Sequence, residues 1–210
     1  MSKTIAMASA ASAAVAACVF AGAASADTIP ITSAVGLEAN GAFTGSVTFT
    51  PSNATSGVLS VLLNNTSPAG NGGFLVGLVV LNNANYGGIG VALATTTDAD
   101  FTNTGTTTSA SPFGDYRGGA GLGGTWLGGG NPNPGIPVGG SVTLTFNITG
   151  TGVGAFTAST FITPVGNNPQ FLVRFRGFNN GGSDKVTVPT PGAAALAGLG
   201  LLAAGRRKRS

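Results

Sequence analysis

The chain has 210 residues, of which 36 are glycine, and only 7% are charged, where a soluble domain usually carries roughly 25%. It has no histidine, and its one cysteine, Cys18, lies in a segment that we expect to be removed, which excludes Cys/His nucleophilic catalysis, zinc sites built on these residues and disulfides. Five of the nine cations lie at the two ends, so residues 27–188 carry four cations against six acids, a net charge of −2 that lacks the basic surface needed for nucleic-acid binding.

Residues 1–26 have the pattern of a secretory signal peptide. One cation, Lys3, precedes an Ala-rich apolar stretch over residues 5–23, and small residues at positions 24–26 stand before Asp27. A positive end, an apolar core and a small-residue cleavage site in this order are typical of an export signal. The alternative is a retained membrane helix, against which the weakly apolar core and the small residues argue. We therefore expect signal peptidase to cleave before Asp27.

Residues 27–188 show the period-two alternation of β-strands. In residues 140–150, large apolar residues alternate with threonine and asparagine, which gives one apolar and one polar face. Residues 74–81 are apolar on both faces, which indicates a central strand. The predicted strands cover residues 43–50, 57–64, 74–81, 89–95, 140–150, 155–162 and 171–176.

Turn signals rich in asparagine and glycine separate these strands, and no capped apolar helix pattern lies between them. We therefore predict one all-β domain over residues 27–188, an antiparallel β-sandwich of jelly-roll-like type. A solenoid is the alternative fold, but the sequence shows no constant repeat.

The segment 110–139 interrupts the strand pattern. It is rich in glycine and proline, and Tyr116 and Trp126 lie within it. A loop of this length is usually functional or mobile, and aromatic rings offer sugars a large contact area at a low cost in side-chain entropy. Tyr116 and Trp126 are therefore candidate glycan contacts. The alternative is that both rings fold back and plug the end of the sandwich.

Acidic residues gather in one short stretch. Asp98 and Asp100 lie two positions apart and Asn103 follows, a set of oxygen ligands that suits Ca²⁺. The spacing departs from that of an EF-hand, and a solvated acidic turn is the alternative. The same carboxylates, together with Asp115, are candidates for the acid and nucleophile of a glycosidase. Because no further sequence feature indicates a catalytic cleft, we expect no enzyme activity, no cofactor and no metal, with calcium binding left as an alternative.

Two cations share one face of a predicted strand. Arg174 and Arg176 alternate with apolar residues in the strand over 171–176. They are suited to contact an acidic polysaccharide. The alternative is that they keep the strand soluble and discourage aggregation between sheets.

The C-terminus has three parts. Pro189, Thr190 and Pro191 come first, and residues 192–205 then form an apolar run. The run is followed by four cations, Arg206, Arg207, Lys208 and Arg209. A helix over this apolar run reaches about 21 Å, against a hydrocarbon core of about 30 Å. Since the cations resist translocation, we expect the tail to anchor the chain transiently in the inner membrane with the preceding domain outside.

This order of parts resembles the PEP-CTERM protein-sorting signal of Gram-negative-type bacteria. The resemblance covers residues 189–210, with Thr190 at the position where that family usually has glutamate. It implies that an exosortase, an integral-membrane cysteine protease, cleaves near Pro189–Pro191 and releases the protein or transfers it to the cell exterior. A simple C-terminal membrane anchor is the alternative.

These features favour an exported surface or extracellular-matrix protein with a structural or adhesive role alongside exopolysaccharide. A surface rich in threonine, asparagine, serine and glycine, with few charges, is weakly repelled by neutral glycans. The second hypothesis is a carbohydrate-binding module, with or without calcium, and the third is a polysaccharide hydrolase that uses Asp98, Asp100 or Asp115.

The processing prediction can be checked by intact-mass analysis of the exported protein. We expect the mass to show the loss of residues 1–26 and of the tail beyond Pro191, because both segments are read as sorting signals. Recovery of the untrimmed chain from the cytosol would contradict both assignments.

Overall fold

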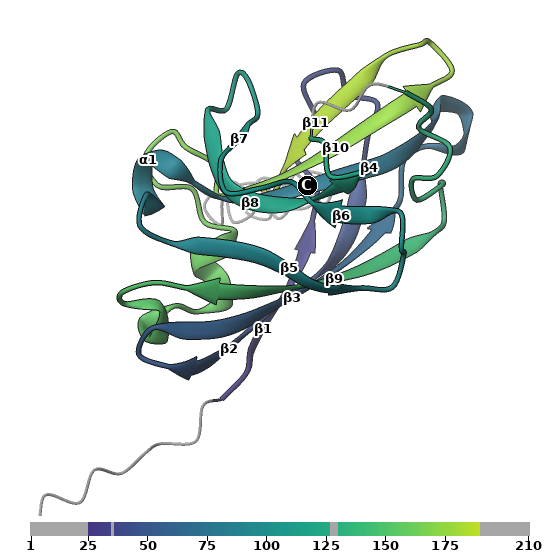
Figure 1. Ribbon diagram of the computed structural model, residues 1–210. Coiled ribbons are helices and arrows are strands. Elements are labelled where there is room, and N and C mark those ends of the chain that lie inside the picture. The colour runs from purple at the N-terminus through teal and green to yellow at the C-terminus, as the bar shows by residue number, and fades with distance from the viewer. Residues whose placement is uncertain (1–24, 35, 127–129, 190–210) are drawn as a thin grey trace, which may run out of the picture.

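The computed structural model describes residues 25–34, 36–126 and 130–189, which form two antiparallel β-sheets packed face to face (Figure 1). Residues 1–24 of the predicted signal peptide, and Thr190, Pro191 and the basic cluster Arg206, Arg207, Lys208 and Arg209 of the tail, lie outside the described residues. Within the described ranges, no helix has the length and apolarity needed to cross a bilayer.

The first sheet has the strand order β1-β2-β3-β9-β5. Its strands are β1 (Asp27–Thr32), β2 (Phe43–Asn53), β3 (Ser56–Asn65), β9 (Ser141–Thr149) and β5 (Gly90–Thr96). The second sheet has the order β11-β10-β4-β8-β6, and β7 also pairs with β8. Its strands are β11 (Ser183–Thr187), β10 (Phe171–Phe178), β4 (Gly72–Asn82), β8 (Asp115–Leu122), β6 (Phe101–Asn103) and β7 (Thr108–Ser109). The prediction of an all-β fold with antiparallel sheets is confirmed.

Alternation decides which face of each strand enters the core. In β9, Val142, Leu144, Phe146 and Ile148 are buried while the residues between them are exposed or partly exposed. Six of the predicted strands are found as β2, β3, β4, β5, β9 and β10. Strand β4 is buried on both faces and lies between β10 and β8, as its sequence indicates.

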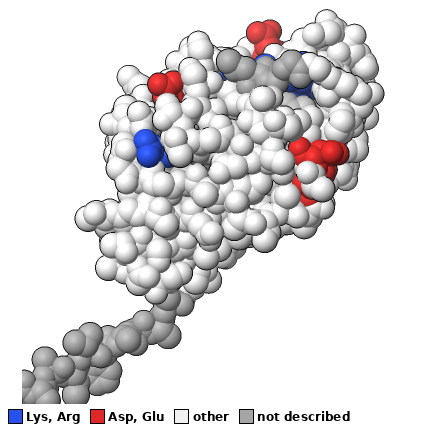
Figure 2. Space-filling view, in the orientation of Figure 1, with Lys and Arg blue, Asp and Glu red and all other residues white. Residues whose placement is uncertain are grey.

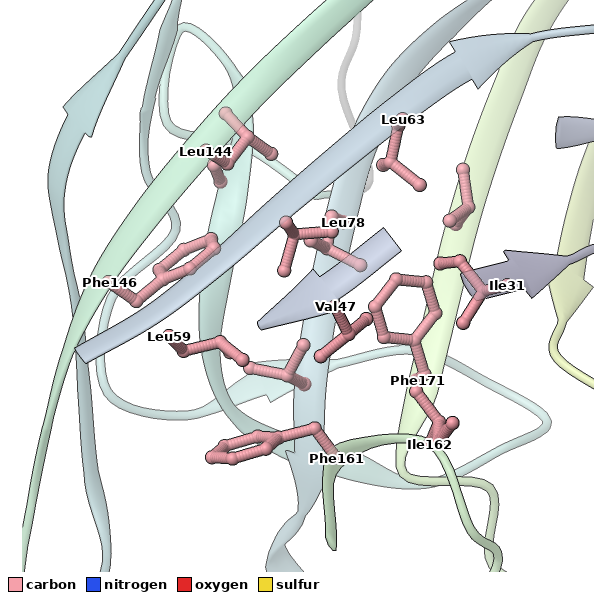
Figure 3. Packing of buried hydrophobic residues seen from close by; sticks show 14 of the residues in the cluster. Ile31, Val47, Leu59, Leu63, Leu78, Leu144, Phe146, Phe161, Ile162 and Phe171 are labelled. Atoms are coloured by element: carbon pink, nitrogen blue, oxygen red, sulfur yellow. The ribbon is translucent and has the colours of Figure 1, made fainter. Parts of the chain in front are cut away.

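Both sheets contribute to one hydrophobic core. Figure 3 shows Leu59, Leu144 and Phe146 of the first sheet close to Leu78 and Phe171 of the second. Most of these side chains are fully buried, and burial of each large apolar side chain contributes about 1.5–3 kcal/mol. The two sheets therefore hold each other through their inner faces.

The predicted strand over residues 155–162 is wrong. The structure has two 3₁₀ helices there, η2 (Val153–Ala155) and η3 (Ala158–Phe161). Thr157 and Thr160 form a reciprocal capping box, and the Asp27 carboxylate accepts from the Ala158 N–H at 2.9 Å. Ala158 and Phe161 are the buried residues, and their spacing of three places both on one side of a 3₁₀ turn.

The prediction of a continuous loop over residues 110–139 is also wrong, because β8 lies within it as an inner strand of the second sheet. Glycine permits a close approach here. A Cβ atom on Gly119 would lie 1.9 Å from the Leu78 carbonyl oxygen, and one on Gly118 would lie 2.7 Å from that of Val91. The glycine content of this segment therefore reflects tight strand packing, which composition alone does not distinguish from a loop.

The buried carboxylate of Asp184 fixes the loop that joins β1 to β2. Its oxygens accept hydrogen bonds from the backbone N–H groups of Glu38, Asn40 and Gly41 at 2.9–3.0 Å. Asp184 is 2% exposed and lies on β11 of the second sheet. One side chain thus connects the edge of the second sheet to a loop of the first.

Replacement of Asp184 by asparagine should lower the free energy of unfolding by about 2–3 kcal/mol, because charge-assisted hydrogen bonds to buried N–H groups are lost. Urea denaturation followed by circular dichroism measures this difference. The matched control is Asp100→Asn, at an exposed carboxylate, which should leave the midpoint nearly unchanged. Equal midpoints for the two variants would contradict a structural role for Asp184.

Candidate functional site

Tyr116 and Trp126 are not supported as glycan contacts, because the structure buries both side chains. Tyr116 is 0% exposed and Trp126 is 4% exposed. They form a second hydrophobic cluster with Val79, Ala110 and Leu172. The Tyr116 hydroxyl donates to the Pro169 carbonyl at 2.9 Å. The two rings therefore hold the segment around β8 in place, which is close to the alternative interpretation of rings that fold back.

The cations of β10 and β11 donate hydrogen bonds to the segments that flank β8, which together we name the covering segment. Arg174 Nη1 donates to the Trp126 carbonyl at 2.8 Å, and Arg176 Nη2 donates to the Gly130 carbonyl at 3.2 Å. Lys185 Nζ donates to the Ser111 carbonyl. These contacts give Arg174 and Arg176 a structural role within the domain.

The charged forms of Arg174 and Lys185 are less stable in the folded domain than in water. Burial lowers the pKa of Arg174, and the nearby charge of Arg176 lowers it further. Burial likewise lowers the pKa of Lys185, with a further contribution from Arg174. The Trp126 carbonyl compensates in part for the desolvation of Arg174, whose buried Nε has no hydrogen-bond partner among the described residues.

The structure separates the acidic residues that a hydrolase would need to combine. Asp98 and Asp100 precede β6, whose Phe101 pairs with Leu122 at one end of β8, whereas Asp115 starts β8 at its other end. A strand of this length separates the two ends by about 20 Å, while glycosidase carboxylates lie within about 5–9.5 Å of each other. Asp115 therefore does not form a catalytic pair with either residue.

Asp98 and Asn103 serve local turns. The Asp98 carboxylate accepts from the Asp100 N–H at 3.0 Å, and the Asn103 side-chain oxygen accepts from the Gly105 N–H at 3.2 Å. In the part of the chain that the structure describes, no three acidic, histidine or cysteine side chains gather in a way that would hold a metal ion. The acidic stretch therefore provides no candidate site.

A polar pocket of about 400 Å³ lies at one end of the second sheet. Three turns surround it: the turn that begins with α1 (Asn83–Tyr86), the turn before β8 and the turn before β10. Figure 1 shows α1 at this end of the sandwich. The residues that line the pocket include Asn82, Asn83, Phe113, Asp115, Asn167 and Asn168. We name this the asparagine pocket.

Buried amides fix the base of the asparagine pocket. The Asn82 N–H donates to Gln170 Oε1 at 2.8 Å, and Asn82 Nδ2 donates to the Phe113 carbonyl at 2.8 Å. The side-chain oxygen of Asn82 accepts from the Ala84 N–H and so caps α1. Asn82 and Gln170 are nearly fully buried, so the three turns are joined by hydrogen bonds rather than by loose contact.

Arg117 holds the wall of the pocket. Its Nη1 donates to the side-chain oxygen of Asn83 at 2.9 Å, and its Nε donates to the carbonyl of Ile89 at 2.5 Å. These two bonds orient the Asn83 amide and tie both ends of the α1 turn to β8. Arg117 is therefore a positioning residue.

Several hydrogen-bonding groups of the pocket remain available for a ligand. Among the described residues, no partner is found for Asn83 Nδ2, for the Asn167 amide, for Asn168 Oδ1 or for the Asp115 carboxylate. An amide offers both a donor and an acceptor, and a carboxylate offers acceptors. Hydroxyl groups are complementary to both, and the partly buried ring of Phe113 adds an apolar surface.

The sequence contained the asparagines of this pocket only as turn signals. Asn82–Asn83 and Asn167–Asn168 mark turns after β4 and before β10. In an antiparallel pair, the end of one strand and the start of the next lie at the same edge. Because β4 and β10 are hydrogen-bonded neighbours, their pairing brings these asparagines together. A prediction of the pocket from the sequence therefore requires knowledge of which strands pair.

The two tyrosines of the chain provide a test of this arrangement. Burial raises the pKa of Tyr116 far above that of a free phenol, with a smaller opposing effect from the Asn82 amide, and burial also raises the pKa of Tyr86. A raised folded-state pKa favours the neutral phenol, so its contribution to stability is complete below about pH 10, the unfolded value, and is lost at higher pH.

We expect Tyr86 to ionise in the folded protein and Tyr116 to ionise only together with loss of the β-sheet signal. Tyrosinate absorbance and circular dichroism, recorded in parallel during an alkaline titration, measure both events. The Tyr116→Phe variant should lack the second absorbance step. Reversible ionisation of both tyrosines with an unchanged β-sheet signal would contradict the buried position of Tyr116.

Comparisons of this chain with protein-family models, with curated proteins and with solved structures found no match. Its function is therefore inferred from the chemistry of the asparagine pocket and of the chain ends.

Proposed function

We propose that this chain is an exported, non-enzymatic surface or extracellular-matrix protein that associates with exopolysaccharide through the asparagine pocket. The observation that carries the proposal is the set of unpartnered amide groups and one carboxylate around this pocket, among the described residues. Groups of this kind, held at fixed positions, select ligands that carry many hydroxyls.

The surface around the pocket supports a neutral ligand. Figure 2 shows only scattered charged atoms on the visible face of the domain. Among the described residues that line the pocket, Asp115 is the one charged residue, and the nearby cation Arg117 donates a hydrogen bond to Asn83. A weak local field gives little advantage to a charged polymer over a neutral one.

A binding role suits the pocket better than hydrolysis. Cleavage of a glycosidic bond ordinarily requires two carboxyl groups on opposite sides of the bond. Asp115 is the single carboxylate that lines the described pocket, so the site holds a glycan without the pair that would cut it.

The chain ends support delivery to the cell exterior. Residues 1–26 fit a signal peptide, and residues 189–210 resemble a PEP-CTERM sorting tail. In this proposal, signal peptidase and an exosortase-type membrane protease process the chain during a transient stay in the inner membrane. We also assign the sandwich to the jelly-roll type, because β3 with β9 and β4 with β8 form nested antiparallel pairs across the two sheets.

A glycan array probed with the full-length chain tests this function. We expect saturable binding to neutral polysaccharides, retained in the presence of a chelator. Asp115→Ala and Asn168→Ala should each weaken binding about tenfold, since each removes a hydrogen bond worth about 1–1.5 kcal/mol. The matched control, Asp100→Ala, removes an exposed carboxylate outside the pocket and should bind as the original chain does.

Two results would contradict the proposal. Absence of binding to every glycan would remove the adhesive role, and equal affinities for Asp115→Ala and the control would move the site elsewhere. Binding lost on chelation would favour a calcium-assisted module instead, and release of shortened sugars would favour a hydrolase.

A further inference from the structure

We infer that the glycan site continues past the asparagine pocket, over the α1 turn, into a second hollow in which the ring of Tyr86 stacks on a sugar. The ligand is then an extended chain of neutral sugars rather than a single sugar or a chain end. This inference rests on the proposed function and specifies its ligand.

The second hollow has a volume of about 300 Å³ and is lined by the later residues of α1 and the turn that follows it. Asn85 and Tyr86 from α1, Gly88 from the following turn, and Thr151 and Phe156 from the segment after β9 line it. The residues of one short turn thus line both hollows, with Asn83 and Ala84 in the first and Asn85 and Tyr86 in the second.

Hydrogen bonds join the walls of the two hollows. Asn168, which lines the asparagine pocket, donates from Nδ2 to Asn85 Oδ1 at 3.4 Å, and Gln170 Nε2 donates to the same oxygen at 3.2 Å. These contacts tie residues of the two hollows together through amide groups, and amides can hydrogen-bond to the hydroxyls of a sugar that spans both.

The ring of Tyr86 is held rigidly by a row of aromatic rings that reaches into the core. Its centroid lies 5.7 Å from that of Phe156 in an edge-to-face arrangement, and Phe156 lies 6.0 Å from Phe161. Phe161 in turn contacts Phe49, and both are fully buried. A ring that is fixed before binding loses little side-chain entropy when a ligand covers it.

The second hollow has the chemistry of a neutral sugar subsite. Tyr86 is half-buried, and the position of a Cβ atom on Gly88 has no neighbouring atom within 4 Å, which leaves the turn beside the ring open. The apolar face of a sugar ring packs well on an aromatic ring, while its hydroxyls suit Asn85 and Thr151 at the rim. No charged residue lines this hollow in the described structure.

Arg117 fixes the position of the two hollows relative to each other. It donates to Asn83 at the start of the α1 turn and to Ile89 at the end of this turn. Both walls are therefore fixed to the same strand, β8. A preorganised pair of subsites on one rigid element gains affinity when a single chain occupies both.

The test uses the full-length chain and neutral glucan, mannan and xylan oligosaccharides from mono- to hexasaccharide, with affinities measured by calorimetry. We expect affinity to increase with chain length and then to reach a plateau. Tyr86→Ala should weaken binding of the long oligosaccharides about tenfold and leave that of the shortest bound sugar unchanged. Tyr86→Phe should retain the affinity, because it keeps the ring that stacks.

Control measurements separate a binding effect from a folding effect. Thermal unfolding of Tyr86→Ala shows whether the domain stays folded, and Thr151→Val tests the same hollow at an exposed rim residue without removing the ring, with an expected loss of a few-fold. Affinity that is independent of chain length, together with full binding by Tyr86→Ala and Thr151→Val, would overturn the inference. If Asp115→Ala still weakened binding about tenfold in that case, the proposed function would stand with one subsite. Absence of binding by every oligosaccharide and polysaccharide would overturn both.

Discussion

The second sheet must be covered on both faces, and most of the molecule follows from this constraint. Strand β4 places Leu78 and Val80 in the main core and Val79 in the outer cluster with Leu172 of β10. The chain meets this requirement with the segments that flank β8 in sequence, which include Ser111 on one side and Trp126 and Gly130 on the other. The Trp126 side chain packs in the outer cluster. Cations from β10 and β11 then bind the carbonyls of this cover. The turn before β8, which belongs to the same segment, forms one wall of the asparagine pocket.

The asparagine pocket is a consequence of how turns are fixed at one end of this sandwich. Turns that lie in water are usually mobile and lose entropy when a ligand orders them. Here Asn82 and Gln170 are buried and hydrogen-bonded, so the turns that carry the outer asparagines are already ordered. The same end receives the aromatic row that leads to Tyr86. The buried residues of the domain thus position both the outer asparagines and the ring of Tyr86.

The sequence predicts the strands that have one apolar and one polar face, because alternation follows directly from the geometry of the sheet. Strands β2, β3, β9 and β10 were found in this way. Strand β8 was missed because Gly118, Gly119 and Gly121 leave no apolar period to detect, and only the neighbouring strands show why glycine is needed there. The pocket was missed for a related reason: its asparagines come from turns distant in sequence, and their proximity depends on which strands pair. The burial of Tyr116 and Trp126 fits the interpretation of rings that fold back, which a glycine-rich composition alone does not distinguish from rings on an exposed loop.

The placement of the cations has a consequence for how the domain responds to its surroundings. All four cations of residues 27–188 donate hydrogen bonds to the protein itself: Arg117 to Asn83 and Ile89, and Arg174, Arg176 and Lys185 to carbonyls of the covering segment. Long-range attraction between free surface charges weakens as ionic strength rises, since the Debye length falls from about 10 Å at 0.1 M salt to about 3 Å at 1 M. Because the acceptors of these four cations are uncharged carbonyl and amide oxygens rather than carboxylates, the hydrogen bonds that they make within the domain depend little on ionic strength.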